Sequence, residues 1–197
     1  MPTLDRSPAL VATGFLAIPV AQALVALPSD LLSTIQAAPI DPALADTAAF
    51  SEAYGYPLEG GANCIVVVGK RGDEVRHAAC VVLASTKLDV NRVVKKLLDV
   101  RKASFAPMDQ AVELTGMEYG GITPIGLPAD WPVYVDARVL GAPEVVVGAG
   151  LRGAKVFLPG RTLAALPNVT VVEGLAVEDQ ATDAPDTPDA SDATDVG

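Results

Sequence analysis

The stretch Thr115–Pro128 reads Thr-Gly-Met-Glu-Tyr-Gly-Gly-Ile-Thr-Pro-Ile-Gly-Leu-Pro and contains four glycines and two prolines. Proline fixes φ at about −65° and lacks an N–H, whereas glycine adopts positive φ at little cost. This composition predicts a rigid loop, centred on Gly120–Pro124, that exposes backbone amides. Amides held in fixed directions can bind a carbonyl oxygen or an oxyanion. An ordinary surface turn is the alternative interpretation of the same composition.

The segments on both sides of this loop alternate between apolar runs and turn residues. Before the loop we expect helices over 41–56, 90–98 and 107–114, and a hairpin of strands over 62–69 and 75–84. After it we expect strands over 133–136, 144–147, 155–158 and 169–173. Strands mixed with single helices and hairpins indicate an α+β fold with a mixed sheet, curled toward a barrel and flanked by helices.

The composition of the 197 residues favours one domain with an aliphatic core, because half of the residues are apolar but only 5% are aromatic. We expect residues 1–40 to form helical or extended segments docked on the core, and residues 41–177 to form the main domain. Residues 178–197 hold seven acids and no base, which accounts for most of the net charge of −10. This tail lacks apolar periodicity and is expected to be disordered.

The segment Ala9–Leu27 is apolar and reaches the lower length limit of a membrane span. Gly14 and Pro19 interrupt it, and the single basic residue before it, Arg6, is balanced by Asp5. We therefore expect a soluble, cytoplasmic protein without membrane association, with a signal peptide or a span as the alternative.

Several classes of site are not indicated, since the sequence has no G-x-S-x-G, H-E-x-x-H, C-x-x-C or P-loop pattern. The single histidine, His77, excludes a His-based zinc cluster and is expected at the surface. Cys64 and Cys80 lie in apolar runs and are interpreted as small buried hydrophobic residues in a reducing compartment. We expect neither a metal nor a cofactor.

Two further patterns leave alternatives open. The segment Lys70–Lys102 holds nine bases and four acids, which fits either phosphate contacts or a solvated face. The run Gly148–Gly153 matches G-x-G-x-x-G, but a short strand closed by Pro159-Gly160 follows it where a dinucleotide site needs a helix. A hairpin turn is therefore favoured, and a dinucleotide-dependent oxidoreductase ranks far behind.

The glycine loop and its context resemble the YbaK/ProX family of aminoacyl-tRNA deacylases, which includes the editing domain associated with prolyl-tRNA synthetase. The resemblance covers about Asp41–Ala176, and the matching segments are Asn63-Cys-Ile-Val-Val, Leu88-Asp89, Lys102-Ala-Ser-Phe-Ala-Pro, the loop itself, Val135-Asp136 and Gly148–Gly153. It implies the mixed barrel-like fold of that family and hydrolysis of the ester of mischarged tRNA, acting in trans for translation fidelity. Aminoacyl-tRNA, and an aminoacyl-tRNA synthetase, are the implied partners.

The resemblance also implies the site residues. Backbone amides would activate the ester carbonyl, which makes the loop residues Gly120, Gly121, Ile122, Thr123 and Pro124 the catalytic candidates. The substrate-binding candidates are Asn63, Cys64, Asp136, Gly148 and Lys155.

The sequence departs from the family at four of these positions. The family usually has Lys-Thr where Asn63 and Cys64 stand, a serine at Gly148 and an aspartate at Lys155. If the two strands line one pocket, Lys155 could replace the lost ammonium and meet a phosphate or carbonyl oxygen; the alternative is an exposed strand lysine. The departures also leave open a catalytically silent module that binds tRNA or the aminoacyl group.

Overall fold

The computed structural model describes residues 2–178, so that the predicted acidic tail lies outside the described residues except for Glu178. Its strands are β1 (Ser7–Pro8), β2 (Gln36–Pro39), β3 (Ala62–Arg71), β4 (Glu74–Leu83), β5 (Thr86–Leu88), β6 (Lys102–Phe105), β7 (Val133–Asp136), β8 (Val145–Gly148), β9 (Ala154–Leu158), β10 (Val169–Val172) and β11 (Ala176–Glu178). Its α-helices are α1 (Ile18–Val25), α2 (Ser29–Leu32), α3 (Thr47–Tyr54), α4 (Lys95–Leu97), α5 (Met108–Thr115) and α6 (Ala137–Gly141).

The strands form three sheets, with the orders β10-β7-β4-β3-β6, β1-β2-β9-β8 and β11-β5. The five-stranded sheet is mixed, because β7 pairs in parallel with β10 and β4 while β3 pairs antiparallel with β4 and β6. An isolated bridge between Gly61 and Val146 joins this sheet to the four-stranded one. The mixed α+β class is therefore confirmed, whereas curling into a barrel is not supported, since the described strands do not close into a ring.

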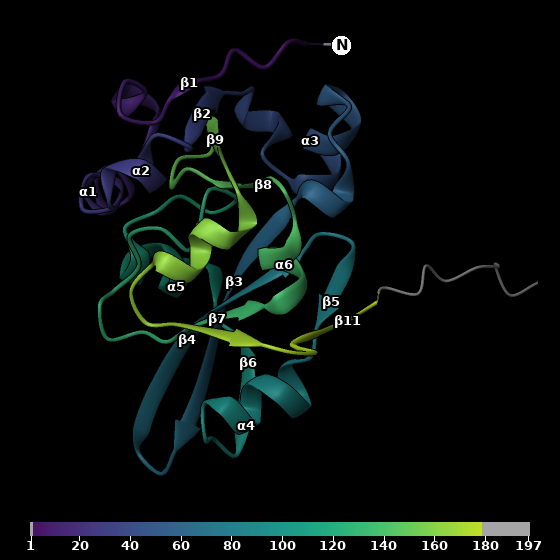
Figure 1. Cartoon of the computed structure of the whole chain (residues 1–197). Coiled ribbons are helices and arrows are strands. Elements are labelled where there is room, and N and C mark those ends of the chain that lie inside the picture. Colours follow the sequence, from purple (N-terminus) through teal and green to yellow (C-terminus); the bar gives the residue numbers. More distant parts are fainter. Residues whose placement is uncertain (1, 179–197) are drawn as a thin grey trace, which may run out of the picture.

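The main core lies between the two larger sheets and is almost wholly aliphatic, as the composition predicts. Val81, Val133 and Val135 of the five-stranded sheet are buried together with Val147 and Val156 of the four-stranded sheet. The N-terminal segment packs into the same cluster through Ala9, Ala12, Leu16, Val20, Leu24 and Ile35. Figure 1 shows this segment beside β2 and β9, at the end of the molecule opposite α4.

Most of the elements expected from sequence are found at or near their expected bounds. The helices expected over 41–56 and 90–98 are exceptions. The first is divided into a 3-10 turn at Pro42–Leu44 and α3, and the second begins as a π-helical segment at Val90–Val94 and continues as α4. The backbone N–H of Val94 donates to the carbonyl of Asp89, five residues earlier. Both Val90 and Val94 are buried, so the wider turn places two apolar residues against the five-stranded sheet.

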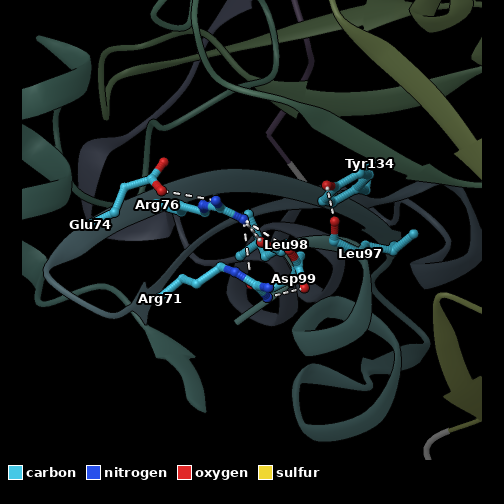
Figure 2. Close-up of polar contacts among 7 residues, drawn as sticks. All are labelled: Arg71, Glu74, Arg76, Leu97, Leu98, Asp99 and Tyr134. Carbon is cyan, nitrogen blue, oxygen red and sulfur yellow. Dashed lines mark hydrogen bonds and ion pairs between the residues drawn. The ribbon is translucent and has the colours of Figure 1, made fainter. Parts of the chain in front are cut away.

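Arginines from the β3–β4 hairpin bind the carboxyl-terminal end of α4 (Figure 2). Arg76 donates to the carbonyl of Leu98 at 3.1 Å and to the carboxylate of Glu74 at 2.8 Å. Arg71 pairs with the carboxylate of Asp99, a residue with φ of 52°. These cations satisfy carbonyls that a helix leaves unpaired at its end. Two of the nine bases in 70–102, Arg71 and Arg76, thus have structural partners within the protein.

Candidate functional site

A cavity of about 790 Å³ opens between the start of α3, strands β3, β8 and β9, and the glycine loop. Six of the ten residues proposed from sequence line it: Asn63, Cys64, Gly120, Ile122, Gly148 and Lys155. The other four, which are Gly121, Thr123, Pro124 and Asp136, are not among its lining residues. The two strands that carry Asn63 and Lys155 therefore do face one pocket.

The glycine loop is held against the turn between β8 and β9 by two backbone hydrogen bonds, and a third closes the loop on itself. Gly121 donates to Glu118 at 2.9 Å, Gly150 donates to Gly121 at 2.7 Å, and Glu118 donates to Gly150 at 2.8 Å. Thr123 and Ile125 behind it are fully buried. The loop is therefore more than an ordinary surface turn, because Glu118, Tyr119 and Gly120 are exposed whereas Gly121 and residues 123–125 are buried behind them.

Gly148 allows this close approach. A Cβ at Gly148 would lie 2.2 Å from the carbonyl oxygen of Gly121 and 2.7 Å from that of Ile122, so a side chain cannot be accommodated without moving backbone. This contact gives a physical reason for glycine at a position where the resemblance leads us to expect serine.

Two amides of the loop are available to a ligand. Gly120, with φ of +83°, and Ile122 both line the cavity. Within residues 2–178 neither N–H donates a hydrogen bond to another group. Gly120 is exposed and Ile122 is half-buried, so that water or a ligand can supply the acceptor that each donor needs. Free amides on a rigid loop at a cavity wall are the arrangement that can stabilise a developing oxyanion.

Lys155 is buried at the wall of the cavity, with 6% of its surface exposed, so the alternative of an exposed strand lysine is wrong. Its Nζ donates to the carbonyl of Ala45 at 2.7 Å and lies 5.5 Å from the centre of the Phe50 ring. Burial lowers the pKa of Lys155 to about 8; Arg152 also lowers it, and the carboxylate of Asp46 opposes the shift. Burial disfavours the charged form of an amine, which explains the direction.

The neighbouring candidates on β3 are polar but not acidic or basic at neutral pH. The Oδ1 of Asn63 accepts a hydrogen bond of 2.6 Å from the hydroxyl of Thr47. Burial raises the pKa of the Cys64 thiol to about 12, so that the thiolate is scarce at neutral pH. Cys80 is fully buried, as expected, whereas Cys64 is partly exposed and lines the cavity.

The mouth of the cavity holds residues that sequence reasoning did not identify. Phe105, Met108 and Tyr119 line it with 60%, 56% and 57% of their surfaces exposed. Arg152 lines it as well and donates to the carbonyls of Pro42 at 3.0 Å and Tyr119 at 3.2 Å. Phe105, Tyr119 and Arg152 each lie inside a segment that matches the family, but nothing in the sequence indicated that their side chains meet at one rim.

Asp136 lies elsewhere and has structural partners. It caps the start of α6, and its carboxylate accepts hydrogen bonds from Arg138 Nε at 2.8 Å and from the backbone N–H of Ala176 at 3.0 Å. Burial alone would raise the pKa of Asp136, but the hydrogen bonds from Arg138 and Ala176 outweigh it and hold the pKa below its usual value. The structure thus separates Asp136 from the other substrate-binding candidates.

Asp136→Ala is expected to lower the free energy of unfolding by about 2 kcal/mol, because the buried N–H of Ala176 would lose its acceptor. Since the folded-state pKa is depressed, this stability is present above the unfolded pKa of about 3.9 and is lost as pH falls through the folded value. Urea unfolding of wild type and Asp136→Ala at pH 7 and pH 3 measures the difference in free energy of unfolding. The difference should shrink at pH 3, and an equal difference at both values would contradict the assignment.

His77 is not the plain surface residue that was expected. Its ring stacks on Trp131 with centroids 5.1 Å apart, and its Nε2 is buried without a partner in the described part of the chain. Burial lowers the pKa of His77, opposed by Asp130. It is not among the lining residues of the cavity.

The late glycine run forms a hairpin, as favoured from sequence. Strands β8 and β9 pair antiparallel around Gly148–Gly153, and β9 follows where a dinucleotide site needs a helix. In residues 2–178 no helix is long and apolar enough to cross a bilayer. The same residues contain no group of three or more His, Cys, Asp or Glu side chains placed to hold a metal ion.

The sequence of residues 41–166 matches the family described as the aminoacyl-tRNA editing domain. The chain belongs to the aminoacyl-tRNA editing domain family. The matched range contains every residue proposed for the site, including the glycine loop and both strands that carry Asn63 and Lys155. The resemblance inferred from the loop is thereby confirmed at the level of the family.

Solved structures share the editing-domain fold at low sequence identity. One is a candidate trans-editing enzyme for prolyl-tRNA synthetase, with a TM-score of 0.66 and 22% identity over 83% of this chain and 99% of that one. A scaffold used in computational epitope grafting has a TM-score of 0.67 and 22% identity over 83% of this chain and 97% of the scaffold. A hypothetical protein, APE2540, has a TM-score of 0.63 and 22% identity over 71% of this chain and 90% of that protein. At this identity the likeness concerns the fold.

Proposed function

We propose that this protein is a deacylase that hydrolyses the ester of mischarged aminoacyl-tRNA. The observation that carries the proposal is the pair of unsatisfied amides, of Gly120 and Ile122, on a rigid loop at the wall of a cavity. Membership of the editing-domain family supports it. Aminoacyl-tRNA is the proposed substrate, a synthetase that releases mischarged tRNA is the proposed partner, and the cytoplasm is the proposed place of action.

The mechanism would rest on positioning. The ester carbonyl would lie against the two amides, which stabilise the oxyanion that forms when water attacks. An aminoacyl ester is already reactive, so that a positioned water and a hydroxyl of the terminal ribose would complete the site. Cys64 would act as a wall residue and not as a nucleophile, since its thiol stays protonated at neutral pH.

The terminal nucleotide would occupy the mouth of the cavity. Phe105 and Tyr119 expose more than half of their surfaces there and offer ring faces to an unpaired base. Stacking of a base on an aromatic side chain contributes about 1–3 kcal/mol and tolerates any base. The RNA would thus be held by its end, with the acyl group directed toward the glycine loop.

The reaction is tested by release of labelled amino acid from a panel of aminoacyl-tRNAs that includes alanyl and cysteinyl esters of proline tRNA. Turnover of at least one ester above the rate of spontaneous hydrolysis is expected. If every ester persists while the folded protein still binds tRNA, the deacylase is rejected.

Phe105→Ala is expected to raise KM for an aminoacyl-tRNA about tenfold with little change in kcat, because it removes a stacking surface and no group near the carbonyl. Phe15→Ala is the matched control, since Phe15 is also exposed but does not line this cavity. Steady-state kinetics of both variants separates the effect on KM from the effect on kcat. Equal KM values for the two variants would contradict the placement of the RNA end.

A further inference from the structure

The ammonium of Lys155 is a buried charge without an ionic partner. Its Nζ uses one of three N–H donors, on the neutral carbonyl of Ala45 at 2.7 Å. No ion pair involves Lys155 among the described residues, although only 6% of its surface is exposed. Lysine is almost never fully buried unless it is paired. The two remaining donors are therefore available at the wall of an open cavity.

The surroundings favour an anion as the missing partner. The charged residues that line the cavity are Asp46, Arg152 and Lys155, so cations outnumber anions. The carboxylate of Asp46 already accepts hydrogen bonds from the N–H groups of Ala48 and Ala49 at the start of α3. The other titratable groups here are the Tyr119 phenol at the rim and the Cys64 thiol on the wall, and burial raises the pKa of that thiol to about 12, so that it carries no charge at pH 7.

The position of Lys155 relates it to the proposed reaction centre. Lys155 pairs with Gly148 across β8 and β9, and Gly148 lies against the carbonyls of Gly121 and Ile122 in the glycine loop. A substrate whose carbonyl meets this loop therefore presents its flanking groups to Lys155. Those groups are the side chain of the acyl residue on one side of the ester and the terminal nucleotide on the other.

We propose that Lys155 determines specificity by binding an anionic group of the substrate, either a carboxylate in the acyl side chain or the phosphate of the terminal nucleotide. This inference rests on the proposed function and deepens it. A buried charge that lacks a partner is costly, and a hydrogen-bonded anion offsets that cost. Esters that bring an oxyanion to Lys155 are thus selected over esters that do not.

Anion binding would be coupled to proton uptake. Burial holds the pKa of free Lys155 at about 8, and Arg152 acts in the same direction while Asp46 opposes it. A bound anion favours the charged form and raises that pKa. Between pH 7 and pH 9 the complex therefore takes up protons, and the affinity for the anion falls as pH rises through 8.

Four minimal substrates separate the two sources of the anion. They are the alanyl and aspartyl esters at the 3′ end of adenosine, each with and without a 5′-phosphate. If the carboxylate is the anion, wild type should hydrolyse the aspartyl esters with a kcat/KM at least tenfold above that of the alanyl esters. If the phosphate is the anion, the esters with a 5′-phosphate should exceed those without it by the same factor. Lys155→Met, which keeps length and removes charge, should abolish that preference. Lys96→Met, a change at an exposed lysine, should retain it.

A measurement without turnover keeps this inference separate from the proposed function. Calorimetric titration with inorganic phosphate and with acetate, in buffers of different ionisation enthalpy, reports both affinity and proton uptake. Binding of one anion with proton uptake at pH 8, lost in Lys155→Met and kept in Lys96→Met, supports the proposal even if no ester is hydrolysed. The proposal is overturned if neither phosphate nor acetate binds to wild type. It is also overturned if Lys155→Met and Lys96→Met bind the anion equally well and show the same ester preference.

Discussion

Gly120→Val is expected to lower kcat/KM for aminoacyl-tRNA by at least about 100-fold. Gly120 has φ of +83°, a conformation that valine does not adopt without strain, and an added Cβ would lie 2.5 Å from Arg152 Nη1. The Arg152 guanidinium can move aside, but the strained backbone is expected to shift the amide of Gly120 relative to the cavity. Loss of a single oxyanion donor costs about 100- to 1,000-fold in kcat. Release of labelled amino acid under single-turnover conditions measures the change.

Gly72→Val is the matched control for this variant. Gly72 has φ of +61° at the exposed β3–β4 turn, and no atom lies within 4 Å of the position that its Cβ would take. Both variants pay a similar conformational penalty, but only Gly120→Val alters the cavity. Equal activity of the two variants, with both folded, would show that the loop amides do not activate the carbonyl.

Gly148→Ala is expected to impair both activity and stability. The new Cβ would lie 2.2 Å from the carbonyl oxygen of Gly121, so β8 and the glycine loop must separate by about 1 Å. Displacement on this scale costs about 100-fold in rate, and overpacking costs about 1–3 kcal/mol of stability. Urea unfolding and the deacylation assay, run on the same preparation, measure the two effects.

Gly141→Ala is the control for Gly148→Ala, because no atom lies within 4 Å of the Cβ position at Gly141. It should retain activity and stability, since alanine is favoured over glycine in a helix such as α6. If Gly148→Ala retains full activity and stability, the contact between β8 and the loop is not needed for the site.

Sequence predicted the elements because their signals are local. Pro107 and Gly116 mark the two ends of α5, and Gly116 adopts the left-handed conformation that ends a helix. The hairpin of β3 and β4 follows from two apolar runs around a glycine turn. The arrangement of sheets was less accessible, since the join between them is one bridge, Gly61 to Val146, with no sequence signature.

The site was predicted in part, and the misses share a cause. The glycines of the loop and of Gly148–Gly153 can be recognised from composition alone, whereas the burial of a side chain depends on packing between distant segments. The sequence around Lys155 is equally compatible with an exposed side chain. Its burial results from the pairing of β9 with β2 and from the contact of Nζ with the carbonyl of Ala45. Asp136 ends a buried strand, as a site residue would, but its carboxylate accepts hydrogen bonds from Arg138 and Ala176.

The walls of the cavity come from stretches that are far apart in the chain, from Ala45 to Lys155. The unfolded chain cannot assemble such walls, so that a ligand of the cavity binds the native state alone. By mass action, a ligand at 100 times its Kd would stabilise the whole domain by about 2.7 kcal/mol. A rise in melting temperature across a library of esters and anions would therefore identify ligands of this protein before any turnover is known.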